Sequence, residues 1–268
     1  MRSSAGKHAR PAKVKRYGKR IALLILTLIF LGGLGYALYP VGTGTKLVLE
    51  SHRAVEKFLR YSAANGKSNA NIISSGEEVN EVNIDAPMPY SKLYEAMKAY
   101  NEQIYAEGQS GLCDAWAYQE PSFDLTEYGM ETGVTGVLKI AKINLEMPVY
   151  LGATYENMAK GAAHLSQTSL PIGGMNTNCV IAGHRGWQGA PFFLFLDKLE
   201  EGDEVSFTNL WETLTYIVCD IRVIKPNDVD EILIQPGRDM LTLVTCHPYA
   251  SGGKFRLVVF CERVGIAS

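Results

Sequence analysis

The amino-acid sequence predicts a mainly β domain, a barrel or a sandwich, preceded by a membrane anchor and a helical region. From residue 133 onward, short runs of Val, Ile, Thr and aromatic residues are separated by clusters of Gly, Pro or Asn. The helical patterns between these runs are short, which argues against a parallel α/β sheet. The 268 residues are 47% hydrophobic and 20% charged, a composition that supports a buried core in one or two domains.

Charge divides the chain into two unequal parts. Residues 1–20 contain eight Lys or Arg and no acid, so this tail carries +8 although the whole chain carries −2. The remaining residues hold 18 basic and 28 acidic side chains, a charge of −10. Because an acidic folded part repels phosphates, the composition argues against a nucleic-acid-binding domain.

An apolar segment follows the basic tail directly. Residues 21–39 carry no charge and are followed by Pro40, and a helix needs about 20 apolar residues to cross a bilayer. This run is longer than that of a cleavable signal peptide, and no A-x-A cleavage site follows it. We expect an uncleaved single-pass anchor, ended by Pro40, with residues 1–20 in the cytoplasm and the remainder exported. A cleaved signal and a buried core helix are the alternatives.

The region between the anchor and the β-rich part, residues 40–132, contains two helical patterns. Apolar residues recur at helical spacing within residues 46–61 and again within 93–104, and Gly108 is expected to end the second helix. Residues 62–75 are rich in Ser, Asn and Gly and predict a loop.

Seven segments in the β-rich part, residues 133–268, have the composition of strands. They are 136–143, 147–151, 179–182, 204–208, 215–224, 241–246 and 255–263. Residues 155–161 and 192–199 predict short helices or turns between them. Within 215–224, the alternating residues Ile217, Cys219, Ile221 and Val223 are expected to form the buried face of a half-buried strand.

Five cysteines are scattered along the chain without a C-x-x-C motif: Cys113, Cys179, Cys219, Cys246 and Cys261. An odd, scattered set is not typical of a disulfide scaffold, and it supports neither a zinc knuckle nor a thioredoxin-type site. Cys246 differs from the others because it ends a strand and opens into a loop that contains Pro and Gly. A nucleophile at such a place is held rigidly and stays accessible.

His184 and Arg256 are the candidate partners of the Cys246 thiol. A thiol nucleophile needs a neighbouring base or cation, and His184 ends one strand and opens a Gly-rich loop. His247 follows Cys246 directly, but neighbouring residues of a strand point to opposite faces. Nine residues including a Gly-Gly pair lie between Cys246 and Arg256, which suits a hairpin that brings them together. Arg256 is therefore either a donor for an oxyanion or a residue at the solvent edge.

Two long segments resemble the sortase family. The segment TLVTCHPYASGGKFRLVVFCERV, around Cys246, resembles the family's T-L-x-T-C signature with an Arg on the next strand. The segment GAAHLSQTSLPIGGMNTNCVIAGHRGWQGAPFFLFLDKLEEGD, around His184, is similar to the family's His segment. Residues 136–151 are similar to its opening strand pair, so the resemblance spans about residues 133–264.

The resemblance implies a closed eight-stranded sortase-type β-barrel and a cysteine transpeptidase of the thiol-protease type, with no cofactor. Cys246 would attack the Thr carbonyl of an L-P-x-T-G-like sorting signal, between Thr and Gly, to form a thioacyl enzyme. His184 would act as general acid and base, and Arg256 would stabilise the oxyanion or position the signal. The host would be a Gram-positive bacterium, and the catalytic domain would lie outside the cell membrane.

Details of the two segments resemble class C, the pilin-polymerising sortases, whose acceptor is a lysine amine of another pilin. Class C members carry a lid loop with an Asp-Pro-aromatic motif before the barrel, and Asp114-Ala115-Trp116, within a loop near 109–120, matches its first and third positions. Trp116 would then cover Cys246 and Asp114 would approach Arg256, with a less rigid loop because Pro is replaced by Ala. Many class C members have a C-terminal span, and no second apolar run of that length occurs here.

Three alternatives remain open from the sequence. The chain could be a sortase that anchors surface proteins to a peptidoglycan amine in the cell wall, an anchored thiol hydrolase, or a surface-binding module without activity. Cys246 and His184 alone are too few ligands for a metal site.

Overall fold

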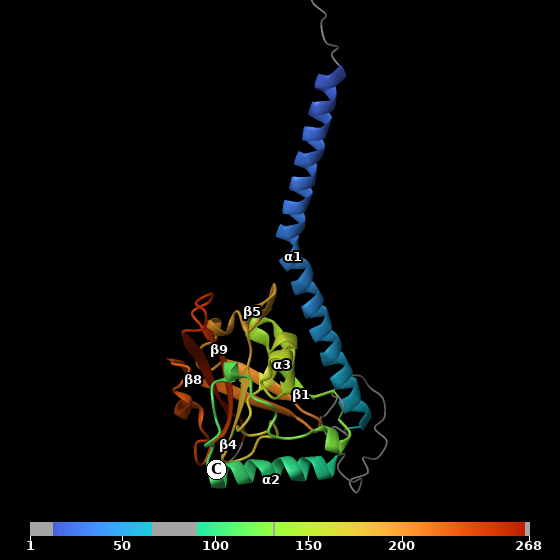
Figure 1. Ribbon diagram of the computed structural model, residues 1–268. Coiled ribbons are helices and arrows are strands. Elements are labelled where there is room, and N and C mark those ends of the chain that lie inside the picture. Colours follow the sequence, from blue (N-terminus) through green and yellow to red (C-terminus); the bar gives the residue numbers. More distant parts are fainter. Residues whose placement is uncertain (1–12, 66–89, 131, 266–268) are drawn as a thin grey trace, which may run out of the picture.

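The computed structural model describes residues 13–65, 90–130 and 132–265 of the chain. Residues 1–12 of the basic tail and residues 66–75 of the expected loop lie outside these ranges. The described chain forms a β-barrel from which one long helix projects, while a second helix lies across the opposite end (Figure 1).

Eight strands close into a barrel in the order β1-β2-β3-β4-β9-β10-β8-β7, and β7 pairs back to β1. The strands are β1 (Val134–Ile140), β2 (Leu145–Leu151), β3 (Ala162–His164), β4 (Thr177–Ala182), β7 (Glu204–Thr208), β8 (Thr213–Ile224), β9 (Asp239–His247) and β10 (Phe255–Arg263). Two neighbouring pairs, β2–β3 and β4–β9, are parallel, and the others are antiparallel. The predicted fold class is confirmed.

The barrel core is formed by large apolar side chains from every side of the sheet. Leu138, Ile181, Phe207, Leu243 and Val259 are all fully buried in one cluster. Strand β4 is buried along its whole length and β9 along most of it, because helices and loops cover their outer faces. These two strands are parallel neighbours, so their carboxyl ends lie at the same edge of the barrel.

The first half of strand β8 has the opposite facing from the one that the sequence predicts. Leu214, Tyr216 and Val218 are buried, whereas Ile217 and Cys219 are only half-buried. Tyr216 can take the inward position because its hydroxyl donates to the buried carboxylate of Asp239. A register shift follows, and beyond it Ile221 packs against the barrel core as expected. The expected face was wrong in the first half because Tyr was counted with the polar residues.

Three α-helices are described: α1 (Lys13–Asn65), α2 (Ser91–Glu107) and α3 (Tyr155–Lys160). The end of α2 at Gly108 and the position of α3 agree with the sequence patterns. Short 3-10 turns occur at η1 (Ala115–Ala117), η2 (Thr126–Tyr128), η3 (Ala141–Ile143), η4 (Leu196–Lys198) and η5 (Val229–Ile232).

Helix α1 does not end at Pro40, contrary to expectation. The proline lies inside one 53-residue helix, and the helix changes direction part-way along (Figure 1). A proline inside a helix removes one hydrogen bond and bends the axis without necessarily ending the helix. The anchor and the residues 46–61 that pack on the barrel are therefore one continuous element.

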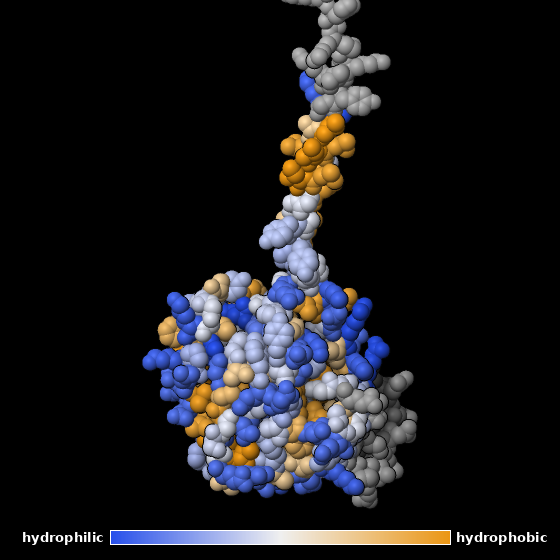
Figure 2. Space-filling view, viewed as in Figure 1, coloured by the Kyte–Doolittle hydropathy of each residue, from blue (hydrophilic) through white to orange (hydrophobic). Residues whose placement is uncertain are grey.

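The projecting part of α1 contains the uncharged residues 21–39. Figure 2 shows an orange band on this part of the helix, clear of the barrel surface. Its most apolar window has a mean hydropathy of 2.4 and none of it is buried against the rest of the chain. Within the described residues, α1 is the one helix long and apolar enough to cross a membrane, so it is a candidate membrane span.

The sequence patterns missed three short strands. Strand β3 joins β2 to β4, and β5 (Arg185–Trp187) pairs with β6 (Ala190–Phe192) in a separate hairpin. Each of the three has three residues, which is too short for an alternating pattern to be recognised. The β5–β6 hairpin follows His184 directly and becomes important for the site.

Candidate active site

Cys246 and Arg256 lie directly opposite each other on two antiparallel strands. The register of β9 and β10 pairs Arg256 with Cys246, as the hairpin argument predicted. The guanidinium Nη1 lies 3.8 Å from the Cys246 Sγ. Gly253, whose φ of +77° suits glycine, lies in the loop between the strands, and its carbonyl accepts a 2.7 Å hydrogen bond from the same Nη1. The hydrogen bond to Gly253 therefore holds the guanidinium beside the thiol.

His184 reaches the same edge of the barrel from the parallel neighbour of β9. Strand β4 pairs with β9 as far as Ala182 opposite Val244, and the register extended by two residues places His184 level with Cys246. Thr245 reinforces this register, because its hydroxyl donates a 2.8 Å hydrogen bond to the Gly183 carbonyl. Thr245 of the T-L-x-T-C signature therefore joins the segment that carries the thiol to the segment that carries the imidazole.

Asp114 and Trp116 lie over this edge in the loop between α2 and β1. Asp114 accepts two hydrogen bonds from Arg256, at 2.7 Å from Nε and 2.6 Å from Nη2. The guanidinium carbon lies 4.3 Å from the centre of the Trp116 ring, and the indole N–H donates to His184 Nδ1 at 3.4 Å. The loop thereby joins Arg256 to His184, in the place that the resemblance implies for a lid.

A cap and buried packing support the loop at Ala115, the position where the class C motif has proline. Asp114 caps the turn η1 by accepting a hydrogen bond from the Trp116 backbone N–H at 3.3 Å. Ala115 is buried in an apolar cluster that includes Leu112 and Val244. Packing and the Asp114–Arg256 ion pair therefore hold the loop without the fixed φ of a proline.

The surroundings of the site favour uncharged forms of the thiol and the imidazole. Burial raises the pKa of the Cys246 thiol, and the carboxylate of Asp114 raises it further, against the opposing effect of Arg256 and Arg185. Burial lowers the pKa of His184 to about 4. With the loop in this position, both pKa shifts favour a neutral thiol and a neutral imidazole.

The hydrogen bonds of His184 indicate which tautomer is present. Nδ1 accepts from Trp116, so the ring proton of the neutral imidazole is on Nε2. Nε2 is buried and has no hydrogen-bond partner among the described residues. A ring N–H without a partner is suited to donate to a group that enters the site.

Three further residues at the site escaped the sequence analysis. The Trp187 ring stacks on the His184 ring, with centres 4.3 Å apart and planes 12° apart. Arg185, buried and paired with Asp197, lowers the pKa of Cys246. Tyr118 lies close enough for the Cys246 thiolate to raise its pKa, although burial has the larger effect. Trp187 could have been noticed from sequence, because it lies three residues after His184 in the same Gly-rich loop.

The remaining cysteines have structural surroundings, and no disulfide links any of the five. Cys179 and Cys261 are buried, which raises the pKa of each far above its ordinary value. Cys219 lies beside the Phe260 carbonyl, away from the site. No group of three or more His, Cys, Asp or Glu side chains able to hold a metal occurs in the described part of the chain.

A thiol, an imidazole and a guanidinium at one edge of a closed β-barrel define a candidate cysteine acyl-transfer site. Comparison with known proteins agrees with this class, because the family model named Sortase domain matches residues 138–264. The chain belongs to the sortase family, whose members are cysteine transpeptidases.

Among curated relatives, Sortase D of Bacillus subtilis is 29% identical over 137 residues, which cover 50% of this chain and 66% of that protein. Sortase A of Staphylococcus aureus is 35% identical over 121 residues, 43% of this chain and 56% of that protein. The chain thus spans about two thirds or less of these two relatives.

The solved structures that match include class C sortases. Sortase C-1 from Actinomyces oris is 33% identical, with a TM-score of 0.59 over 66% of this chain and 99% of that chain. Sortase C of Streptococcus pneumoniae is 27% identical, with a TM-score of 0.65 over 81% and 98% of the two chains. The latter match extends beyond the barrel.

Proposed function

We propose that this chain is a membrane-anchored class C sortase that joins pilin subunits. It cleaves an L-P-x-T-G-like sorting signal between Thr and Gly and transfers the Thr carbonyl to a lysine amine of another pilin. The carrying observation is the Asp114–Arg256 ion pair beside Cys246, a lid contact of the kind that the class C resemblance implies. The pilus-related sortases among the similar structures support the same class.

The proposed reaction proceeds in two half-reactions at Cys246. The thiol proton passes to His184 while the sulfur attacks the Thr carbonyl, and Arg256 donates hydrogen bonds to the oxyanion. The Thr–Gly C–N bond then breaks, and the departing Gly amine takes the proton from His184. In the second half-reaction the lysine amine attacks the thioacyl carbonyl and gives a proton to His184. The C–S bond breaks, the sulfur recovers its proton, and an isopeptide bond remains.

The lid position shown by Asp114 and Trp116 is the resting state in this proposal. Asp114 accepts hydrogen bonds from Nε and Nη2 of Arg256, so these two donors are not free to bind an oxyanion. Departure of the loop removes a negative charge and a hydrophobic cover from the thiol. Both changes lower the pKa of Cys246 and favour the thiolate.

The anchor supports a reaction between membrane-held substrates. The basic tail keeps the N-terminus in the cytoplasm, α1 crosses the bilayer, and the barrel lies on the outer surface. Confinement of the enzyme beside anchored pilins raises their effective concentration at the site.

The test is incubation of the full chain in detergent with an L-P-x-T-G peptide and two acceptors, a pilin and a peptidoglycan-stem amine. Mass spectrometry should detect the Thr carbonyl joined to a pilin lysine, and Cys246→Ala should abolish the product. Joining to the stem amine alone would contradict the pilin proposal and favour a wall-anchoring sortase. Release of free acid despite abundant amine would contradict transpeptidation altogether.

A further inference from the structure

We infer that the membrane anchor positions the imidazole of the active site, through a contact between α1 and the β5–β6 hairpin. The inference rests on the proposed function, because it takes His184 as the acid and base of the reaction. Trp187 is the positioning residue in this arrangement, because it joins the hairpin to His184 by stacking on the imidazole ring. Gly44 of α1 and Gly189 of the hairpin form the contact that sets its position.

The contact between helix and hairpin is close enough to require glycine on both sides. A methyl group on Gly44 would lie 2.4 Å from the Gly189 carbonyl carbon, and one on Gly189 would lie 2.1 Å from the Pro40 oxygen. The Thr43 hydroxyl donates a 2.9 Å hydrogen bond to the Gln188 carbonyl. The two segments therefore meet backbone to backbone, an approach that a side chain at either glycine would prevent.

The short loop of the hairpin connects the α1 contact to the Trp187 ring that stacks on His184. Its two loop residues, Gln188 and Gly189, have φ of +47° and +88°, as a two-residue type I′ loop requires. Trp187 pairs with Ala190 across this loop, so one residue separates the helix contact from the stacked ring. A shift of the loop moves Trp187 and with it the cover of His184.

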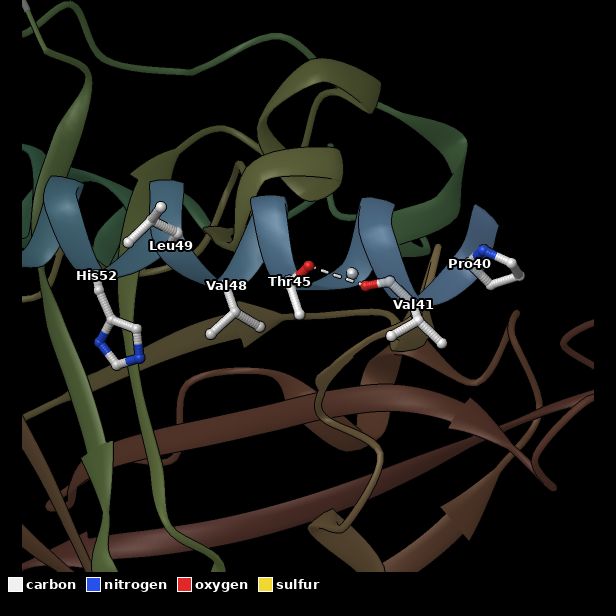
Figure 3. Close-up of a pocket in the computed structure, with 8 residues that line it drawn as sticks. Pro40, Val41, Thr45, Val48, Leu49 and His52 are labelled. Carbon is white, nitrogen blue, oxygen red and sulfur yellow. Dashed lines mark hydrogen bonds between the residues drawn. The ribbon is translucent and has the colours of Figure 1, made fainter. Parts of the chain in front are cut away.

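Other contacts hold the base of the hairpin in the barrel core and fix the angle of Trp187, whereas α1 contacts the tip of the hairpin. The edge of Trp187 meets the Tyr155 ring, with centres 6.0 Å apart. Beside the glycine contact lies a groove of about 440 Å³, lined by α1 residues and Gly189. Figure 3 shows Val41, Thr45 and Val48 projecting from the same side of the helix into this region. Because space remains there, the glycine contact and the Thr43 hydrogen bond limit where the loop lies.

The position of the contact along α1 places it at the membrane surface. The apolar run ends at Tyr39, and Gly44 follows about 7 Å further along a helix that rises 1.5 Å per residue. A change in the tilt of the anchor therefore reaches the hairpin within about one and a half helical turns. The anchor therefore contacts the same hairpin whose Trp187 covers the imidazole.

The test uses two matched pairs of variants in the full chain. Gly44→Leu disrupts the contact, and Gly42→Leu places the same side chain two residues away in open space. Thr43→Val removes the hydrogen bond to the hairpin, whereas Thr45→Val removes hydroxyl bonds that stay within α1. The milder Thr43→Val keeps the test valid if Gly44→Leu reduces folding.

The first readout is the rate at which diethylpyrocarbonate modifies His184, measured by mass spectrometry of its peptide. We expect a rise of about tenfold for Gly44→Leu over Gly42→Leu, which corresponds to about 1.4 kcal/mol in the opening of Trp187. Thr43→Val should show a smaller rise over Thr45→Val. This readout needs no substrate, so it holds or fails independently of the proposed pilin reaction.

The second readout is peptide cleavage with a sorting-signal peptide over a range of pH. Gly44→Leu should lower kcat by about tenfold with little change in KM, because misplacement of the imidazole affects the chemical step. The acidic limb of its pH profile should also move to higher pH, since a less buried His184 regains a higher pKa. Equal His184 modification rates within both pairs would overturn the inference, whatever the activity.

Discussion

Removal of the Asp114 carboxylate is the sharpest test of the closed loop. Asp114→Ala breaks the bidentate pair with Arg256 and removes the cap of η1, and it leaves the Trp116 stack and its weak bond to His184 in place. The side chains of Arg256 and Asp114 are 7% and 18% exposed. The pair thus lies between an exposed pair, with a contribution of about 0.2–1 kcal/mol, and a fully buried one, whose breakage costs about 3–5 kcal/mol.

We take about 2 kcal/mol as the loss of closed-loop stability, which predicts a roughly 30-fold larger open population. The assay is alkylation of Cys246 by iodoacetamide, followed by mass spectrometry of its peptide. Cys219, which lies away from the loop, serves as the internal reference in the same sample. The rate at Cys246 should rise by about 30-fold while the rate at Cys219 stays the same.

The pH dependence of the same reaction adds a second observable. Asp114 raises the pKa of the Cys246 thiol, and so does the burial that the loop contributes. The midpoint of alkylation should therefore move to lower pH in Asp114→Ala. Glu120→Ala removes an exposed carboxylate from the same segment and should change neither rate nor midpoint. An alkylation rate at Cys246 within twofold of the parent would refute the closed-loop reasoning.

Three other outcomes are expected. Arg256→Lys keeps the charge but loses the planar fork, so kcat/KM for peptide cleavage should fall about 100-fold; parental kinetics would remove Arg256 from the oxyanion role. Burial lowers the pKa of His164 to about 4 from 6.5, so the unfolded chain binds more protons between these values. Stability should fall by about 3 kcal/mol as pH drops through this window, and His164→Gln, compared by thermal unfolding at pH 7 and 5, should reduce that loss. An unchanged pH dependence would contradict the assignment. Gly136→Ala should cost about 1–3 kcal/mol in urea unfolding, because its methyl group would lie 2.4 Å from the fully buried Phe207 ring; a stable variant would show that the ring yields.

Local sequence patterns were sufficient for the long strands of the barrel and for the end of α2, but not for the continuation of α1 through Pro40. Strands β9 and β10 are rich in Val, Leu, Thr and Phe, and the loop between them contains Gly-Gly, so the pairing of Cys246 with Arg256 could be inferred. Asp114 came from the resemblance, and the structure brings it to Arg256. The expected facing was wrong in the first half of β8, because the partner of the Tyr216 hydroxyl, Asp239, is distant in sequence.

The sequence by itself determined an apolar span after a basic tail, a β-rich catalytic part and a thiol at a strand end. These features depend on composition and on the residues within one element. Only the tertiary structure decided that α1 continues through Pro40 and meets the hairpin at Gly44. It also decided that Trp187 stacks on His184 and that burial shifts the pKa values of the thiol and the imidazole toward the neutral forms. The contact between α1 and the hairpin joins residues more than a hundred positions apart, and the pKa values depend on the water that the fold excludes, so no local pattern encodes either.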